Sequence, residues 1–282
     1  CVDLGQGRLA ACKVATDILL HFRPNDPRRP LTLTKLASQA TCRPVVWGDA
    51  VVVPTRVGQV FLFDRETGDQ LGSPFQPPLS PNTSIHWLAP AVYRPGENSQ
   101  LILSDGRNKI YRLALLTDPQ LHLQAEAEGD VGPAPLASRL SVIGDLACAG
   151  TDDGRLDLYQ LPSLEAEPYV DLGAQIVWGP FAVGETWILA TDTEELVALA
   201  AQGQITWRQP LAHGPTTGLP LVDGNDLFIL WQQGGLSRIA IESGSEAGHV
   251  DLRQPTIAGP VAFGKRLAVS TSDGTLLILE RP

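Results

Sequence analysis

The chain has 282 residues, of which 43% are hydrophobic and 18% are charged, with a formal net charge of −10 and a pI near 4.9. These proportions are ordinary for a globular protein and exclude a disordered chain. The acidic balance disfavours nucleic acid as a partner, because binding to phosphates needs a basic surface. No apolar run approaches the roughly 18 residues needed for a transmembrane helix.

A short pattern recurs along the chain: an apolar run, a Gly followed by a polar residue, and a second apolar run. Its glycines are Gly48, Gly96, Gly144, Gly184, Gly224 and Gly264, spaced by 48, 48, 40, 40 and 40 residues. A weaker copy around Gly5 opens the chain. Self-similarity at about 40–50 residues with short strands is typical of β-propellers. The pattern therefore predicts an all-β, seven-bladed β-propeller that forms one domain.

The copy over residues 174–214 illustrates the predicted blade, with strands at 179–185, 186–192, 196–202 and 205–211 separated by turns. Each blade is therefore expected to be a four-stranded antiparallel sheet. The seven blades are placed at residues 1–41, 42–85, 86–131, 132–173, 174–214, 215–254 and 255–282. The last one lacks a fourth strand before Pro282, and we expect the missing strand just upstream of Cys1. A three-stranded last blade is the alternative.

Residues 60–68, Val-Phe-Leu-Phe-Asp-Arg-Glu-Thr-Gly, contain the most informative motif. Asp64 is suited to accept hydrogen bonds from the amides of the following turn, and Gly68 tolerates a positive φ. Residues 239–244 keep a trace of this motif, and Trp207 follows another trace and is expected to wedge between blades. The pattern resembles the PQQ-type repeat of quinoprotein dehydrogenases and of BamB-type scaffold domains, whose propellers usually have eight blades. WD40 propellers are the alternative family, which residues 149–161 and 269–280 resemble, but no copy ends in Trp-Asp.

The sequence predicts no catalytic residue, no cofactor and no metal ligand. Quinoprotein dehydrogenases carry two adjacent cysteines beside the quinone, and this chain has none. The five histidines His21, His86, His122, His213 and His249 show no metal-ligand spacing, so each is expected to be an ordinary exposed or hydrogen-bonded residue. The acid pairs 152–153 and 194–195 are interpreted as solvated turns, with a weak calcium site as the alternative.

A disulfide between Cys1 and Cys12 is one predicted feature, because a hairpin centred on residues 6–7 would set them opposite each other. Such a bond would place the protein outside the cytoplasm. The alternative is that Cys1 is the acylated residue of a bacterial lipoprotein.

Four residues are predicted to contact a protein partner. Arg28 and Arg29 fall between the third and fourth strands of the first copy, in a loop that is either simply solvated or docks an acidic partner. His86 and Trp87 follow a proline-rich connection over residues 73–87, where exposed aromatic groups would serve as anchors. In the alternative interpretation, Trp87 packs between blades.

The predicted function is that of a rigid, non-catalytic propeller that binds protein partners, monomeric and extracytoplasmic. The first-strand stretches contain almost no titratable residues, which disfavours catalysis in the central channel. The alternatives are a ligand-sensing or quinone-dependent enzyme domain with its site in that channel, or a WD40-like adaptor.

Overall fold

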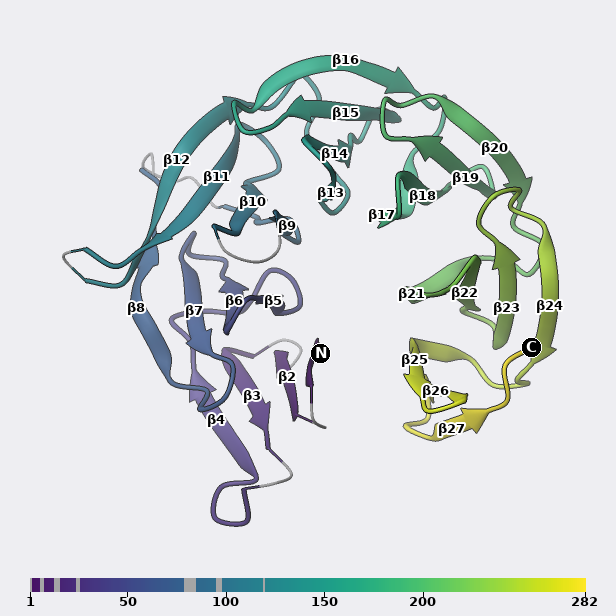
Figure 1. Cartoon of the computed structure of the whole chain (residues 1–282), viewed down its shortest axis with the longest axis horizontal. Coiled ribbons are helices and arrows are strands. Elements are labelled where there is room, and N and C mark those ends of the chain that lie inside the picture. Colours follow the sequence, from purple (N-terminus) through teal and green to yellow (C-terminus); the bar gives the residue numbers. More distant parts are fainter. Residues whose placement is uncertain are drawn as a thin grey trace. The chain divides into compact units, whose positions relative to one another are not determined.

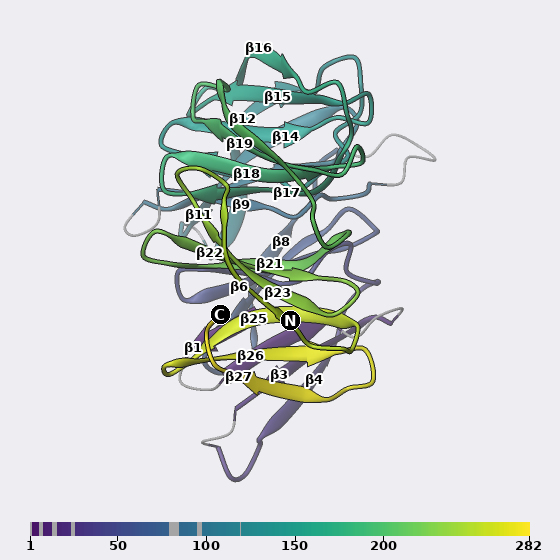
Figure 2. The same ribbon diagram turned by 90° about the vertical axis from the view of Figure 1, so that its right-hand side faces the viewer.

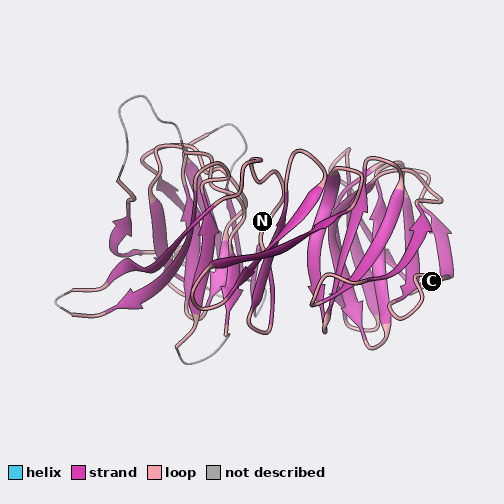
Figure 3. Ribbon diagram, turned by 90° about the horizontal axis from the view of Figure 1, so that it is seen from above, coloured by secondary structure: helices cyan, strands magenta, loops and turns pink. Residues whose placement is uncertain are grey.

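The computed structural model describes residues 2–5, 8–12, 16–23, 26–78, 85–94, 98–118 and 120–282. Within these ranges all regular secondary structure consists of β-strands (Figure 3). None of the described residues forms a helix that is long and apolar enough to cross a membrane. The chain groups into two compact units, Cys1–Ala149 with Asp157–Pro168, and Gly150–Leu156 with Tyr169–Pro282. That the whole chain forms one domain stays a prediction.

The first unit begins with an antiparallel sheet of four strands, β1 (Val2–Gly5), β2 (Arg8–Cys12), β3 (Ile18–Phe22) and β4 (Leu31–Lys35), in that order. The next two sets of strands are β5 (Val45–Trp47), β6 (Ala50–Pro54), β7 (Val60–Asp64) and β8 (Gln70–Phe75), and β9 (Ala91–Tyr93), β10 (Gln100–Ser104), β11 (Lys109–Leu116) and β12 (His122–Asp130). Each set is an antiparallel meander, and a parallel pair between Ser73 and His122 joins β8 to β12 in one eight-stranded sheet (Figure 1).

Four further sheets follow in the chain. The first contains β13 (Ser141–Ile143), β14 (Leu146–Gly150), β15 (Arg155–Gln160) and β16 (Glu165–Asp171), and the second contains β17 (Ile176–Val183), β18 (Thr186–Thr191), β19 (Glu195–Ala200) and β20 (Ile205–Pro210). The third contains β21 (Thr216–Asp223), β22 (Asp226–Trp231), β23 (Gly235–Ala240) and β24 (Glu246–Asp251). The last contains three strands, β25 (Thr256–Phe263), β26 (Arg266–Thr271) and β27 (Leu276–Leu279). The predicted all-β class with four-stranded antiparallel sheets and a three-stranded last one is confirmed. The count of seven blades stays a prediction.

The middle strands are apolar on both faces because neighbouring sheets cover both. Successive side chains of a strand point to opposite faces. In β6, Val51 and Val53 accordingly pack with Leu19 of the first sheet, whereas Val52 packs with Leu101 of β10. Strands buried on both faces read as continuous apolar runs, while the outer strands β4 and β12 alternate between covered and exposed positions.

The second unit repeats this arrangement. Ile188 of β18 packs with Ile229 of β22, and the opposite face of β22, through Leu230, packs with Val269 of β26. The first strands β21 and β25 lie side by side (Figure 2). The core of each unit is therefore a series of apolar layers between adjacent sheets.

Trp207 wedges between two sheets, as its sequence position predicts. It lies on β20, and its indole Nε1 donates a hydrogen bond of 2.9 Å to the carbonyl oxygen of Ile241 in the next sheet. The turn that receives the ring contains Gly244, with a φ of 70°. A Cβ at this position would come within 2.5 Å of the ring of Trp207, so the glycine provides both the turn conformation and the space for the indole.

The turn after β7 has the structure that the motif predicts. Oδ1 of Asp64 accepts hydrogen bonds from the backbone nitrogens of Glu66 at 2.8 Å and Thr67 at 2.7 Å, and Gly68 has a φ of 77°. Burial opposes ionisation of Asp64, but the amide hydrogen bonds outweigh it, so its pKa lies below the usual value. The ionised carboxylate therefore stabilises the folded turn.

Asp64→Ala is expected to lower the free energy of unfolding by about 1–2 kcal/mol at neutral pH, because the charged acceptor of two amides is lost. A group with a lowered pKa contributes stability above its unfolded value, near 3.9, and loses it as the pH falls through the folded pKa. The difference in unfolding free energy between wild type and Asp64→Ala should therefore shrink in acid. Urea denaturation at several pH values measures it; a difference that grew as the pH fell would contradict the assignment. Asp64→Asn, which keeps an oxygen acceptor, should lose less.

Candidate functional site

Arg28 and Arg29 lie in the connection between β3 and β4 (Figure 1). Their backbone nitrogens donate to Oδ1 of Asp26, at 3.0 and 3.1 Å. The hydrogen bonds from the amides of Arg29 and Arg28 lower the pKa of Asp26. Both arginines are exposed, so the loop is held by Asp26 while their side chains reach solvent. Their contact with a partner stays a prediction.

His86 and Trp87 are neighbours with opposite surroundings. His86 is exposed, whereas Trp87 is only 1% exposed, and its ring centroid lies 6.3 Å from that of Phe75 and 5.8 Å from that of Tyr111. The structure therefore places Trp87 in the core between two sets of strands, as the alternative interpretation has it. Of this pair, only His86 offers an accessible side chain for the predicted contact; the prediction for Trp87 is corrected, because a buried ring cannot anchor a partner.

The predicted disulfide cannot be located, because Cys1 lies outside the described residues, and it stays a prediction. Cys12 is half-buried at the end of β2, and burial raises the pKa of its thiol to about 11. The thiol of Cys12 is therefore protonated at neutral pH and a poor nucleophile.

The acidic turns are occupied by local interactions. Asp153 accepts a hydrogen bond of 2.6 Å from Oγ1 of Thr151 and pairs with Arg155 at 3.1 Å. Glu195 pairs with Arg208 at 2.7 Å. Asp153 and Glu195 therefore have cationic or hydroxyl partners, and the interpretation of the two acid pairs as solvated turns stays a prediction.

A cluster of His213, Glu246 and His249 is the feature that the sequence did not indicate. His213 lies between β20 and β21, Glu246 begins β24, and His249 follows on the same strand. One ligand atom from each of the three side chains lies within 4.8 Å of the other two. The side chains are 31%, 33% and 27% exposed, respectively, so the cluster is partly sheltered but open to solutes.

A β-bulge brings Glu246 and His249 to the same face of the sheet. His249 pairs with Ser237 and Glu246 pairs with Ile239, so Ala247 is one extra residue on β24. In a regular strand, residues three apart point to opposite faces, and one inserted residue reverses that relation. A regular strand would place Glu246 and His249 on opposite faces of the sheet, and the bulge places them on the same face. The neighbouring strand β20 has the same kind of bulge at Thr206, but neither bulge is visible in the alternation of the sequence.

Ser237 connects the cluster to the core. Its hydroxyl, on a residue with 0% exposure, donates to Oε1 of Glu246 at 2.5 Å and accepts from Nε1 of Trp231 at 2.7 Å. Nδ1 of His249 lies 2.9 Å from the same oxygen. Because a hydroxyl has one proton, and Ser237 donates it to Glu246, Nδ1 of His249 must be the donor in this contact.

His213 completes the cluster. Its Nε2 lies 3.0 and 3.2 Å from the two carboxylate oxygens of Glu246, and its ring stacks on that of His249 with a centroid distance of 3.8 Å and an angle of 15°. Burial opposes ionisation of Glu246, but hydrogen bonds from Ser237 and His213 outweigh it, so the pKa of Glu246 lies below its usual value. The cluster thus holds an ionised carboxylate beside two stacked imidazoles.

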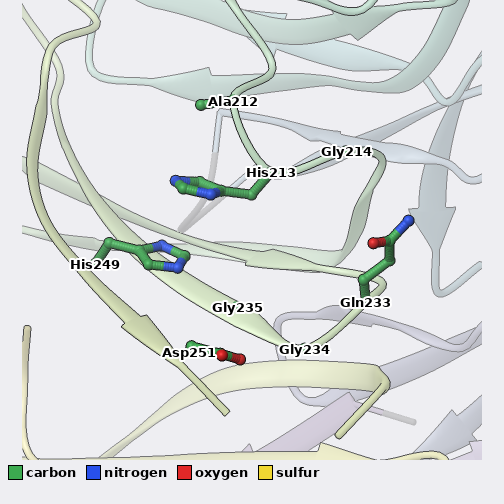
Figure 4. Close-up of a pocket in the computed structure, with 8 residues that line it drawn as sticks. All are labelled: Ala212, His213, Gly214, Gln233, Gly234, Gly235, His249 and Asp251. Atoms are coloured by element: carbon green, nitrogen blue, oxygen red, sulfur yellow. The ribbon is translucent and has the colours of Figure 1, made fainter. Parts of the chain in front are cut away.

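The two histidines line a pocket of about 480 Å³ (Figure 4). Gln233 and Asp251 supply the other polar side chains of its lining, and the remaining lining residues are Ala212, Gly214, Gly234 and Gly235. The described residues that line the pocket include no Lys or Arg, so its polar groups suit a cation or a neutral polar molecule better than an anion.

Comparison with known proteins gives a consistent result. Residues 163–281 match the family model of the "Outer membrane protein assembly factor BamB", and no curated protein sequence matches the chain. The structure is similar to BamB from Moraxella catarrhalis, with a TM-score of 0.68 and 17% identity over 98% of this chain and 83% of that one. It is also similar to BBS1N in two crystals of its complex with ARL6DN. In the mercury-soaked crystal the identity is 15% and the TM-score is 0.73, over 98% of this chain and 87% of that one. In the lead-soaked crystal the identity is 17% and the TM-score is 0.71, over 100% of this chain and 90% of that one.

The similar structures are only 15–17% identical in sequence, so they indicate the fold alone. The family model indicates the repeat type, over residues 163–281. The matched range includes Trp207 but not the motif at Asp64. The chain has a β-propeller fold similar to that of BamB, and its residues 163–281 match the BamB family model.

Proposed function

We propose that this chain is a non-catalytic propeller that binds protein partners. The family model that matches its second half describes an assembly factor of outer membrane proteins, and BBS1N, whose fold is similar, was crystallised in complex with ARL6DN. These relatives support a protein-interaction role in general. The family description also supports the proposal of an extracytoplasmic location.

The observation that carries the proposal is the composition of β4. This outermost strand exposes Leu31 and Leu33, which are 52% and 59% exposed, next to the exposed Arg28 and Arg29. By contrast, the exposed positions of the outer strand β12 are polar: Gln124, Glu126, Glu128 and Asp130. Exposed apolar side chains beside arginines are typical anchors of protein interfaces. The arginines favour a partner with an acidic surface.

The first strands support a non-catalytic role. In β1 the titratable residue is Asp3, and across β5, β9, β13, β17, β21 and β25 the side chains with titratable groups are Tyr93, which is buried, and Asp223. General acid–base catalysis needs titratable groups that converge on a substrate. These strands therefore offer little for an enzyme site.

Crosslinking the chain to membrane and soluble extracts of its source organism tests the proposal. A protein that binds the wild type should be lost with Leu31→Ser/Leu33→Ser and with Arg28→Glu/Arg29→Glu. Each anchor typically contributes about 1–2 kcal/mol, so each double variant should weaken the isolated complex at least about tenfold.

The matched control is Arg56→Glu/Arg107→Glu, which reverses two exposed arginines elsewhere in the same unit and should leave the affinity unchanged. If the control variant lost as much affinity as Arg28→Glu/Arg29→Glu, the loss would be explained by the change in net charge and not by contacts of Arg28 and Arg29. Recovery of a small molecule and no protein would favour the alternative of a ligand-sensing or enzymatic domain.

A further inference from the structure

We propose that His213, Glu246 and His249 form a binding site for one divalent transition-metal ion, and that zinc is the metal its chemistry favours. The site is independent of the proposed protein contact at β4. It rests on the ligand types, the distances between them, the buried residue that orients them and the pocket beside them.

The ligand set identifies the class of metal. Two imidazoles and one carboxylate form a common three-residue zinc set that leaves a fourth position for water. Calcium and magnesium prefer sites made of oxygen ligands alone, whereas imidazole suits zinc, copper and nickel. A pocket that contains Asp251 and no lining Lys or Arg among the described residues adds negative potential for a cation.

The distances fit a tetrahedral ion. Ligand atoms about 2.0–2.1 Å from zinc lie about 3.3–3.4 Å from one another in a tetrahedron. Nε2 of His213 lies 3.0 and 3.2 Å from the oxygens of Glu246, and Nδ1 of His249 lies 3.4 Å from Oε1. The cluster thus holds each histidine at almost the separation from Glu246 that a shared metal requires, and the two histidine nitrogens lie within 4.8 Å of each other.

The imidazole rings must tilt when the metal binds. The two ring planes are nearly parallel, with an interplanar angle of 15°, whereas coordination needs one nitrogen of each ring to point to the same metal ion. The proton on Nδ1 of His249 and the proton that Nε2 of His213 donates to the carboxylate of Glu246 must also leave to solvent, as is general for metal binding to histidine. Both changes are local, because His213 lies in a loop beside Gly214, which has a φ of 81°.

Ser237 is a positioning residue for the carboxylate. It is buried and fixed by Nε1 of Trp231 at 2.7 Å, and its hydroxyl donates to Glu246 at 2.5 Å. Outer-sphere hydrogen bonds of this kind typically change metal affinity by about 10–100-fold. The support of a buried Ser and Trp distinguishes this cluster from a chance meeting of surface side chains.

The test is a titration of the chelator-treated full chain with ZnCl2, followed by calorimetry, and with CoCl2, followed by absorption. We expect one zinc per chain and the intense d–d bands of tetrahedral Co²⁺. His213→Gln/His249→Gln should weaken zinc binding by more than about 100-fold, and Glu246→Gln and Ser237→Ala by about 10–100-fold. Ser237→Ala should also alter the Co²⁺ spectrum, which a merely structural effect on stability would not do.

The matched control is His86→Gln/His122→Gln, which removes two histidines outside the cluster and should leave zinc affinity and stoichiometry unchanged. Circular dichroism of every variant checks that it is folded. No zinc binding by the folded wild type would overturn the proposal. Binding that survives His213→Gln/His249→Gln would also overturn it, because the zinc would then be adventitious and bound elsewhere, for example at a thiol. None of these outcomes depends on the protein partner.

Discussion

Replacing Trp87 by Ala is expected to lower the free energy of unfolding by about 3–5 kcal/mol. The indole is 1% exposed and belongs to the core cluster formed by the second and third sets of strands. Its removal takes away the ring contacts with Phe75 and Tyr111 and leaves a cavity that the surrounding strands only partly fill. Urea denaturation followed by circular dichroism measures the change, with the slope m expected to stay constant.

Trp87→Phe is the matched control. Nε1 of Trp87 is buried and has no hydrogen-bond partner among the described residues, so exchanging the indole for an apolar ring removes an unsatisfied donor at the cost of some volume. The expected loss is below about 1.5 kcal/mol. A loss in Trp87→Ala no larger than that in Trp87→Phe would contradict the buried position and restore Trp87 as a candidate for the partner surface.

Gly244→Ala is expected to lower the free energy of unfolding by about 2–5 kcal/mol. Two effects add. The φ of 70° costs an alanine about 1–2 kcal/mol, and a Cβ would come within 2.5 and 2.7 Å of two ring carbons of Trp207, which is overpacking worth about 1–3 kcal/mol. The Nε1 hydrogen bond of Trp207 to Ile241 limits how far the ring can retreat.

Gly224→Ala separates the two effects. Gly224 has a similar φ of 60°, lies in the same sheet between β21 and β22, and a Cβ there would meet nothing within 4 Å. It should therefore lose only the conformational part, about 1–2 kcal/mol. Equal losses in both variants would show that the wedge of Trp207 contributes nothing at this turn.

Much of the fold could be predicted because propeller sheets are specified locally. The strands of the copy over residues 174–214 were predicted close to their observed positions, since alternation and turn glycines act within a few residues. The turn at Asp64 and Gly68 has the hydrogen bonds and positive φ that the motif implies. Such features need no knowledge of the rest of the chain.

The metal-ligand cluster could not be predicted for a physical reason. His213 and His249 occupy different positions of successive repeats, and the loop that carries His213 lies against β24 only once the two sheets have packed. Glu246 and His249 share a face because Ala247 is bulged, and the bulge depends on pairing with β23. Simple alternation assigns the two side chains to opposite faces.

The environment of Trp87 was also undecided by the sequence. A tryptophan that follows a proline-rich connection can be an exposed anchor for a partner or a buried side chain between two sheets, and the sequence does not distinguish the two. Burial is a property of the neighbours: Phe75 and Tyr111 lie 36 residues apart in sequence and meet Trp87 through sheet packing.

By itself, the sequence determined the strand content, the period of the repeat and the chemistry of its turns, because these depend on side-chain alternation and on backbone conformations available to Gly and Asp. Only the tertiary structure decided that Trp87 is buried, that Leu31 and Leu33 are exposed on an outermost strand, and that Glu246 joins two histidines. Each of these depends on register and on contacts between segments distant along the chain, and a single bulged residue is enough to exchange the two faces of a strand.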